Sequence, residues 1–471
     1  MTGVRLSLPN QRSLLVWGVA AVLLTLAIVL GMQPSIVWLA LLGGGLGAAA
    51  LLQRPALGLP LLMVAALVVP LEIGTGTQVV LNPAALLVPA LLGLWLFRMA
   101  VVERNIAWVP SPVNQPLLLF LVASLVSFAV GRLTWDPFVP ISANFWLVQM
   151  AQWSIFAFSA GAFWLTANQV SSEAQLRQLT MLFLLVAGSI AILRMVPGLG
   201  GPLNRVTTVA FIRAPLWVLL SALAGGQLLF NRGLARPWRV FLWAVTLCSV
   251  YFGFFVNRDS SSTWVGIGAA LGVLIWLRFA RLRLPIVVLA LALLAAGVLF
   301  PAVYEFAGGD DAWRSTGGSR LALIGRVVEV TLRNPVTGLG PAAYRPYANM
   351  KPLPYLGAYW VAPLINSHNN YVDLFAHGGV LGLALFAWFA WEVYRLGLRL
   401  YRRYQEGFAA GYVNGMLAAG AGSLVIMLMA DWILPFVYNI GFPGFQASVL
   451  VWLFLGGLVA LERMTDVDPK R

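Results

Sequence analysis

The sequence predicts an all-α polytopic membrane protein, and its composition, its apolar runs and the placement of its basic residues are the three observations behind this prediction. Of its 471 residues, 60% are hydrophobic and only 10% are charged, whereas a soluble globular chain carries about 25% charged residues. A chain this apolar has too little polar surface to face water, so most of it must face lipid. The single cysteine, Cys248, excludes a disulfide framework or a cysteine metal site within one chain.

Apolar runs recur along the whole chain, each close to the roughly 20 residues that an α-helix needs to cross a bilayer. We predict about 12 to 14 transmembrane helices, a range that arises because the glycines at 43–45 and Pro60 interrupt the second and third runs. The first run follows Arg5 and Arg12 and is too long for the core of a signal peptide, so we expect an uncleaved span. The predicted spans are 13–32, 34–52, 56–72, 80–98, 114–131, 144–166, 177–195, 208–230, 238–256, 262–279, 284–303, 371–393, 410–433 and 444–462.

Basic residues give the chain a formal net charge of +14. In a soluble protein this charge would favour a nucleic-acid partner, but in a membrane protein arginine and lysine accumulate in the cytoplasmic loops. With the N-terminus inside, nearly every second predicted loop collects arginines. We therefore expect both termini to be cytoplasmic and expect no nucleic-acid partner. The predicted inner loops and tail carry Arg54, Arg98, Arg104, Arg232, Arg236, Arg239, Arg278, Arg281, Arg283, Arg395, Arg399, Arg402, Arg403, Arg463, Lys470 and Arg471.

The segment 304–370 is too polar to span a membrane and too long for a simple turn. We expect it to be a long external (periplasmic) loop within a single membrane domain of residues 1–471. Within the loop, 318–333 predicts an amphipathic helix that Ser319 can cap and Pro335 stops. Such a helix is expected to lie in the membrane interface with its apolar face down. The predicted apolar face carries Leu321, Ile324 and Val328, and the polar face carries Arg326, Glu329 and Arg333.

Both histidines of the chain, His368 and His377, lie in one polar stretch that ends this loop. Asn366 or Ser367 can cap a helix that starts near His368, and the positive end of that helix would keep the imidazole neutral, as a general base must be. The alternative is an interfacial histidine that only hydrogen-bonds. The two histidines are nine residues apart, which places them on opposite faces of a helix. We therefore expect no metal ion and no cofactor.

Arginines in the predicted external loops run against the charge trend. A charge near the membrane core is costly and is a functional hypothesis by default. Arg213 lies just inside an apolar run and Arg258 opens the polar cluster 258–262, a depth that suits the diphosphate of a lipid-linked substrate. The alternatives are snorkelling to lipid phosphates or an ion pair such as Arg258 with Asp259. These plainer alternatives are preferred for Arg132, Arg194 and Arg205.

Four motifs, taken in this order, resemble the O-antigen ligase and polymerase family of bacterial envelope glycosyltransferases. They are the arginine-serine cluster 258–262, the helix opened by 318–320, the glycine-rich turn 334–341 and the histidine motif 367–383. The proline and two glycines of 334–341 by themselves indicate only a tight turn. The resemblance covers residues 205–390 with recognisable motifs, and the rest of the chain only as hydropathy.

The resemblance implies an inner-membrane enzyme that transfers a glycan from undecaprenyl diphosphate to an acceptor hydroxyl at the outer face. We expect a direct displacement that inverts the anomeric configuration, and a metal-free site because the external face is poor in paired acids. A ligase uses lipid A core as the acceptor, whereas an O-antigen or exopolysaccharide polymerase uses another repeat unit. His368 matches the family's histidine, and Arg213, Arg258 and Arg320 match its diphosphate-binding arginines. Many members have Glu where this chain has His377. The predicted support or acceptor residues are Asn369, Tyr371 and His377.

Two other classes of protein remain as alternatives. A transporter binds its substrate near the middle of the membrane, on broken helices in repeated halves. The sequence shows no repeated halves, and no acidic residue or lysine is placed in the middle of a span. A structural scaffold of the cell envelope is the second alternative, and it would not bind a lipid carrier. The sequence leaves open whether an enzyme of this kind is a ligase or a polymerase.

Overall fold

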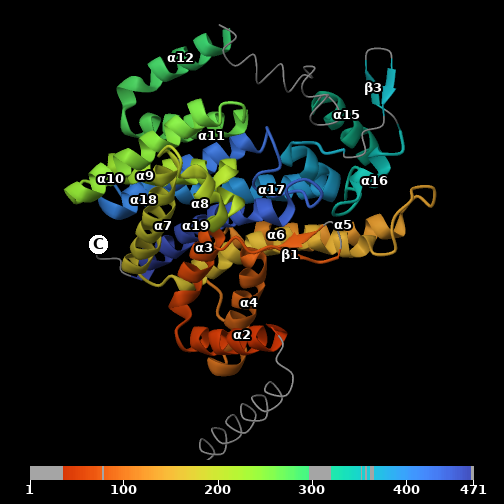
Figure 1. Cartoon of the computed structure of the whole chain (residues 1–471), viewed down its shortest axis with the longest axis horizontal. Helices are drawn as coiled ribbons and strands as arrows, with labels where there is room; N and C mark the ends of the chain where they lie inside the picture. The colour runs from red at the N-terminus through yellow and green to blue at the C-terminus, as the bar shows by residue number, and fades with distance from the viewer. Residues whose placement is uncertain are drawn as a thin grey trace, which may run out of the picture. The chain divides into compact units, whose positions relative to one another are not determined.

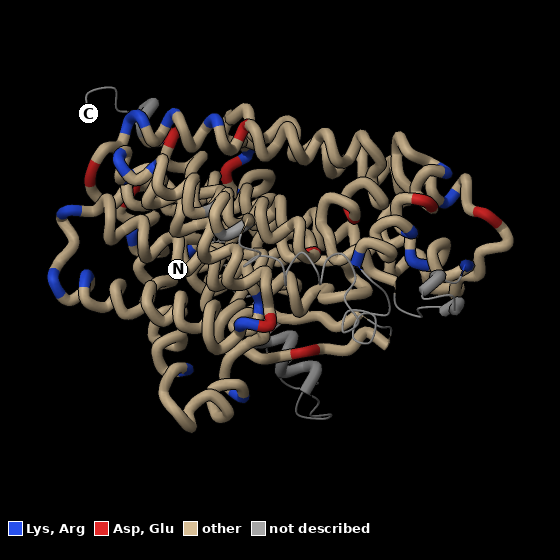
Figure 2. Tube along the Cα trace, turned by 90° about the horizontal axis from the view of Figure 1, so that it is seen from above, with Lys and Arg blue, Asp and Glu red and all other residues tan. Residues whose placement is uncertain are grey.

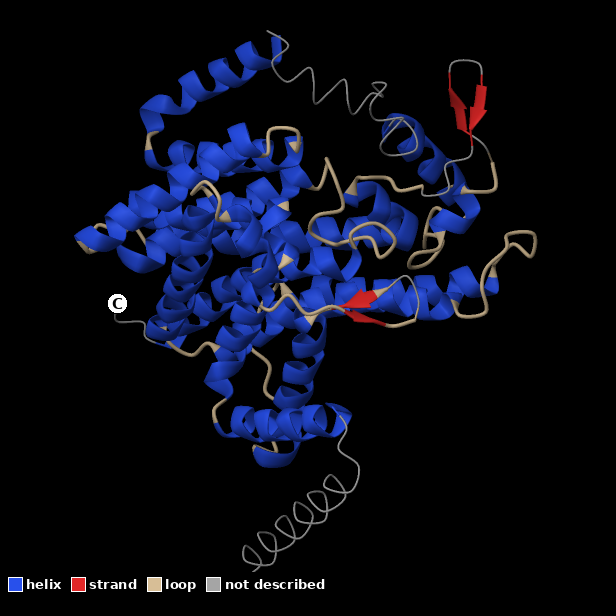
Figure 3. Cartoon of the chain, viewed as in Figure 1, coloured by secondary structure: helices blue, strands red, loops and turns tan. Residues whose placement is uncertain are grey.

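The computed structural model describes residues 36–76, 79–295, 320–351, 353–355, 358–360 and 365–467. These residues are almost entirely α-helical (Figures 1 and 3). The strands make two short antiparallel hairpins, β1 (Ile73–Gly74) with β2 (Val80–Leu81) and β3 (Leu353–Tyr355) with β4 (Ala358–Trp360). The chain forms two compact units, Met1–Pro55 and Ala56–Arg471. Helix α2 (Ile36–Gln53) is the described element of the first unit, and everything below concerns the second.

Eight described helices are long and apolar enough to cross a membrane, which confirms an all-α polytopic membrane protein. The first predicted span lies outside the described residues, and the span 284–303 is described only to Ala295, so the total of 12 to 14 stays a prediction. The eight helices are α4 (Pro83–Phe97, continued to Val102), α5 (Asn114–Leu133), α7 (Glu173–Arg194), α10 (Arg236–Tyr251, continued to Val256), α11 (Ser261–Arg278), α17 (Asn370–Arg403), α18 (Gly407–Ile426) and α19 (Gly441–Val467).

Shorter or less apolar helices complete the second unit. They are α3 (Gly58–Val68), α6 (Phe145–Gln169), α8 (Gly200–Val206), α9 (Ala214–Phe230), α12 (Arg283–Ala295), α15 (Arg320–Thr331) and α16 (Tyr344–Ala348). Helix α9 packs along α18 because glycines let the two backbones approach: a side chain at Gly226 would overlap the carbonyl oxygen of Gly411. Helix α19 packs against α6 and α9, and its residues 444–461 are all buried. These four helices form the core of the unit.

Charged residues are distributed as a membrane protein requires. Figure 2 shows lysines and arginines gathered at the end of the helices where the C-terminus lies, whereas the long middle stretches carry few charges. Helix α10 begins at this basic end with Arg236, and α17 ends with Arg402 and Arg403 in its last turn. This arrangement agrees with cytoplasmic termini, which stay a prediction.

The predicted span 410–433 is wrong at its C-terminal end. Helix α18 ends at Ile426, and residues 427–440 form an irregular loop before α19, which we call the site loop. Because the loop begins with apolar residues, hydropathy alone predicted that the membrane span continues into it. The loop can leave the helical path because side chains satisfy its backbone: Asn370 Oδ1 accepts from the amides of Ile433 (2.9 Å) and Leu434 (3.3 Å).

The amphipathic helix is present as α15, but Arg326 was assigned to the wrong face and the helix ends earlier than predicted. Gly318 and Ser319 lie outside the described residues, and the helix ends at Thr331, before Pro335. Its protein-facing side carries Leu323, Val327 and Val330 together with Arg326, which was assigned to the polar face. Arg326 is buried because its guanidinium donates to the carbonyl of Lys351 (3.0 Å) and pairs with Glu329 (3.1 Å). The 55% exposure of Leu321 does not contradict its place on the apolar face, because that face was expected to meet lipid.

Candidate active site

The predicted tight turn 334–341 docks against a kink in α17. The kink is at Gly379 (φ 64°, ψ −165°), where a side chain would overlap the carbonyl of Val336. Around it, backbone amides donate from Leu339 to Ala376 (2.9 Å), from Val380 to Pro335 (2.8 Å) and from Leu381 to Val336 (3.1 Å). The glycines are therefore required by close backbone approach. The turn therefore fixes the position of the N-terminal part of α17, which belongs to the histidine motif 367–383.

His377 is part of this docking and does not face the candidate site. Its Nδ1 accepts from the amide of Ala342 (3.3 Å), and its carbonyl accepts from the hydroxyl of Ser127 (2.5 Å). Its ring lies 5.5 Å, centroid to centroid, from both Tyr344 and Phe436. His377 thus ties the turn 334–341 and α5 to α17, and a direct role toward an acceptor stays a prediction.

His368 lies before α17 in a tight turn, so the predicted cap is wrong. Helix α17 begins at Asn370, and its cap is Asn369, which accepts from the amides of Tyr371 (3.0 Å) and Val372 (3.2 Å). His368 has a left-handed backbone (φ 48°), and the amide of Asn369 donates to Ser367 Oγ (3.0 Å) across the turn. Neither Asn366 nor Ser367 caps the helix, and His368 stands outside its first turn.

Amide side chains hold the site loop against this turn. Asn370 accepts from Ile433 and Leu434 as described above, and its Nδ2 donates to the carbonyl of Leu434 (2.7 Å). Asn369 Nδ2 donates to the carbonyl of Leu428 (3.0 Å). On the other side, Gln152 of α6 donates to the carbonyl of Pro435 (3.1 Å) and accepts from the amide of Val437 (2.7 Å). The site loop and the turn carrying His368 are therefore placed together.

These elements enclose a cavity of about 210 Å³, which we call the site cavity. The start of α11, the start of α15, the turn before α17 and the site loop each contribute to it. Its lining is Asp259, Ser260, Ser261, Ser262, Arg320, His368, Met429, Ala430, Asp431, Trp432, Asn439 and Ile440. Three motifs that are far apart in the sequence thus meet at one place.

Two of the three predicted arginines lie at or beside the cavity. Arg320 lines it and donates to the carbonyl of Met429 (2.8 Å). The guanidinium of Arg213 lies 5.8 Å from the ring centroid of Trp432 and interacts with the carboxylate of Asp431, both of which line the cavity. The side chain of Arg258 is 78% exposed and only 3.7 Å from Asp259, outside the lining. Arg194, in contrast, bonds Asn204 (2.6 Å) and Thr207 (3.0 Å), which fits a structural role.

The imidazole of His368 is neutral near pH 7, although not for the predicted reason. Burial, followed by the positive charges of Arg320 and Arg345, lowers the pKa of His368 to about 4. The first cause is desolvation of the charged form and the second is repulsion between like charges. The start of α17 was expected to produce this shift, but His368 lies outside that helix.

Two buried acids that sequence reasoning did not assign to the site lie at or near the cavity. Asp431 is 1% exposed and accepts from the amide of Phe436 (2.7 Å) and from Asn439 (2.6 Å). Asp373 is equally buried, interacts with Asp431 and accepts from Ser367 (2.6 Å). The expectation that this face is poor in paired acids is therefore wrong. Asp431 was not predicted as a site residue because it lies in an apolar stretch that was predicted to span the membrane.

Arg345 is a further buried residue that sequence reasoning missed. It is 6% exposed and donates to the carbonyls of Ile365 (3.2 Å) and Tyr438 (2.9 Å) and to the side chain of Asn366. It therefore links the segment before His368 to the site loop. An arginine within the polar loop 304–370 was the only sequence signal for it.

Glu392 is a buried acid of α17, but it lies at the end of the predicted span 371–393 and so leaves the argument against a transporter unchanged. Glu392 of α17 is 8% exposed and lies 3.4 Å from Arg395. Among the described residues, no group of three or more histidine, cysteine or acidic side chains could hold a metal ion.

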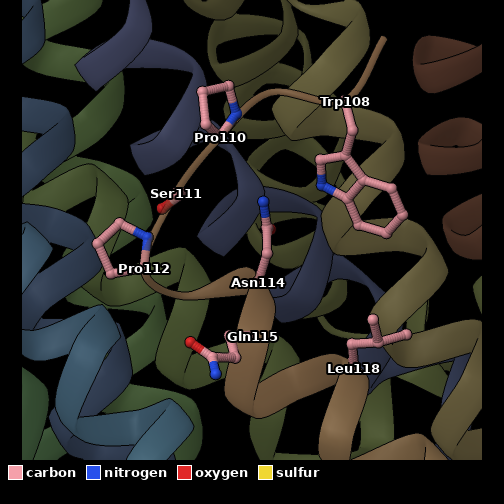
Figure 4. Close-up of a pocket in the computed structure, with 7 residues that line it drawn as sticks. All are labelled: Trp108, Pro110, Ser111, Pro112, Asn114, Gln115 and Leu118. Atoms are coloured by element: carbon pink, nitrogen blue, oxygen red, sulfur yellow. The ribbon is translucent and has the colours of Figure 1, made fainter. Parts of the chain in front are cut away.

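A second hollow, of about 650 Å³, lies away from the site cavity (Figure 4). Its labelled residues belong to the loop before α5 and to the first turns of that helix, among them Trp108, Asn114 and Leu118. The turn 334–341 meets α5 near its other end, where a side chain at Gly131 would overlap the carbonyl of Leu339. The hollow in Figure 4 is thus at the end of α5 opposite to the candidate site.

The membrane helices and the arginine–histidine cavity define a polytopic membrane protein with a candidate site for an anionic substrate. Residues 246–387 match the model of the O-antigen ligase family, which confirms the resemblance predicted from the motifs. The matched stretch, under a third of the chain, is similar to an O-antigen ligase family domain, and this similarity supports a membrane glycosyltransferase-like function. The match includes Arg258, Arg320 and His368 but not Arg213. No curated protein matches the chain.

Proposed function

We propose that the protein is a membrane glycosyltransferase of the O-antigen ligase type. It transfers a glycan from undecaprenyl diphosphate to an acceptor hydroxyl, of lipid A core or a similar acceptor, at the outer face of the inner membrane. The observation that carries the proposal is the site cavity, in which Arg320, the start of α11 and a neutral His368 meet. The family match supports the class of reaction.

The cavity is suited to the diphosphate of the donor. The N-terminus of α11 lies at its edge with Ser261 and Ser262, and a helix N-terminus attracts anions through its dipole and its free amides. Arg320 adds a guanidinium, whose fork geometry matches phosphate oxygens. The guanidinium of Arg213 lies against the ring of Trp432, which lines the cavity. The side chain of Arg258 is exposed to solvent and comes from the turn that also carries the serines. Together they would neutralise the charge that builds on the leaving diphosphate.

His368 would act on the acceptor. The acceptor hydroxyl gives its proton to the imidazole as its oxygen bonds to the anomeric carbon, while the bond from that carbon to the phosphate oxygen breaks. Undecaprenyl diphosphate leaves with the bonding electrons, and one displacement inverts the anomeric configuration. A bound diphosphate also favours the protonated imidazole, which raises the basicity of His368 when the donor is present. The scheme needs no metal ion, because the arginines balance the charge.

The test is a transfer assay with the purified protein in lipid nanodiscs, using a lipid-linked glycan donor. His368→Ala is expected to lower kcat by about 100-fold or more, the usual contribution of a general base. Arg205→Ala, on α8, is the matched control and is expected to retain full activity. Full activity of His368→Ala would remove the base assignment. Transport of substrate into proteoliposomes without a covalent product would instead favour a transporter.

A polymerase would use the same donor and the same cavity, so the acceptor must be identified in cells. In a deletion strain, loss of all polymer from the final acceptor indicates a ligase. A single repeat unit left on that acceptor indicates a polymerase.

A further inference from the structure

Asn439 lines the site cavity near the end of the site loop. Its side-chain Nδ2 donates to Asp431 Oδ1 (2.6 Å), and the other oxygen of that carboxylate accepts from the amide of Phe436 (2.7 Å). A carboxylate accepts hydrogen bonds and does not donate them, so the amide nitrogen of Asn439 must be the atom that faces Asp431. The amide oxygen, Oδ1, is therefore on the side away from Asp431.

This amide oxygen is an acceptor that the protein does not use itself. Among the described residues it has no hydrogen-bond partner, and the side chain is only half-buried. By contrast, the carbonyl of Met429, at the other end of the same loop, already accepts from Arg320 (2.8 Å). Asn439 thus offers a neutral acceptor to a molecule in the site cavity.

The position of Asn439 is held by its backbone as well as by Asp431. Its amide donates to the carbonyl of Phe436 (2.9 Å), and the carbonyl of the preceding residue, Tyr438, accepts from Arg345 (2.9 Å). A group that is fixed before a ligand arrives loses little conformational freedom on binding, so more of its hydrogen-bond energy appears as affinity. The arrangement is therefore suited to recognition.

The size of the site cavity limits what Asn439 can recognise. At about 210 Å³, the cavity is smaller than the roughly 300–1,000 Å³ of a pocket for a drug-sized ligand. It holds only the part of a lipid-linked glycan next to the bond that breaks, which is the diphosphate and the first sugar. Arg320 and the start of α11 would bind the diphosphate on C1 of that sugar. The nearest hydrogen-bond donor is then a hydroxyl or amide N–H on C2.

We propose that Asn439 Oδ1 accepts a hydrogen bond from the substituent on C2 of the first sugar, so that Asn439 makes the protein selective for that sugar. This inference rests on the proposed function. The donor is favoured over the acceptor because the acceptor hydroxyl is bound by His368 in the proposed reaction, whereas the first sugar is bonded directly to the diphosphate.

The test measures Kd for three probes with the purified protein in lipid nanodiscs. The probes are undecaprenyl diphosphate alone, the same carrier with glucose, and the same carrier with 2-deoxyglucose, which lacks only the C2 hydroxyl. The unmodified protein is expected to bind the glucose probe about fivefold or more tightly than the 2-deoxyglucose probe, the usual effect of one hydrogen bond.

Asn439→Ala is expected to bind the two sugar probes equally. It should bind the carrier alone as tightly as the unmodified protein does, which also shows that the variant is folded. Loss of carrier binding in Asn439→Ala would mean that Asn439 maintains the cavity and does not read the sugar.

Asn105→Ala is the matched control. Asn105 is exposed in the loop between α4 and α5 and does not line the site cavity. This variant is expected to keep the full preference for the glucose probe. An equal loss of preference in Asn105→Ala and Asn439→Ala would overturn the inference.

The two proposals fail in different ways. If undecaprenyl diphosphate alone does not bind the unmodified protein, the proposed function is wrong. If the carrier binds but the protein does not distinguish glucose from 2-deoxyglucose, or Asn439→Ala still distinguishes them, only the role of Asn439 is wrong.

Discussion

The backbone conformation of His368 is maintained by hydrogen bonds of neighbouring residues, because His368 lies outside α17. Its left-handed backbone costs on the order of 1 kcal/mol, and the bonds of Ser367, Asn369 and Arg345 maintain it. The residue type and its polar surroundings made it a candidate from sequence. The geometry could not be predicted, because Arg345 and the site loop lie far from it in the chain. The cause of its low pKa was missed for the same reason.

Arg345 contributes to the low pKa of His368, after burial and Arg320. Arg345→Gln removes a positive charge that lowers the pKa of His368, so the pKa should rise from about 4. A general base works unprotonated, and the rate falls as pH drops through its pKa. The acid limb of the kcat/KM profile is therefore expected to move to higher pH in Arg345→Gln.

Arg345→Lys is the control, because it keeps the charge but not the fork of donors. It is expected to leave the limb in place even if the rate falls. Both variants should be checked for folding by thermal unfolding in detergent. The same displacement in both variants would mean that geometry, not charge, carries the effect.

At the scale of elements, apolar runs identified most of the membrane helices, because a run of about 20 apolar residues has few other solutions. The prediction of helices and of their buried faces failed where tertiary contacts override composition. The site loop is apolar but irregular, since Asn370 and Gln152 satisfy its backbone. Helix α15 turns Arg326 inward because the carbonyl of Lys351 and the carboxylate of Glu329 receive its guanidinium. The carbonyl of Lys351 is the partner that periodicity cannot assign, because it lies 25 residues further along the chain.

The kink of α17 should be sensitive to one methyl group. Gly379→Ala places a side chain at positive φ and against the carbonyl of Val336, and is expected to destabilise the protein by about 2 kcal/mol or more. Gly378→Ala is the neighbouring control, since an added side chain there meets nothing within 4 Å. Thermal unfolding in detergent measures both. A similar Tm for the two variants would contradict the account of the kink.

At the scale of the whole molecule, the predicted orientation can be tested with the chain's one cysteine removed. In a Cys248→Ala background, Phe138→Cys and Gln405→Cys place thiols at opposite ends of the membrane helices, at positions that are exposed. A membrane-impermeant thiol reagent applied to spheroplasts is expected to label Phe138→Cys. It should label Gln405→Cys only after permeabilisation. The reverse pattern would invert the topology and place the site cavity in the cytoplasm.

The site loop is also the last wall of the site cavity to be synthesised, so the cavity forms only after this loop has left the ribosome. The other walls of the site cavity, from residues 259–262, 320 and 368, leave the ribosome first, and residues 429–440 follow close to the end of the chain. A nascent chain therefore carries its arginines and histidine into the membrane before the cavity that would use them exists. On the proposed function, the lipid carrier can bind in the complete site only after the site loop has been synthesised and has closed the cavity.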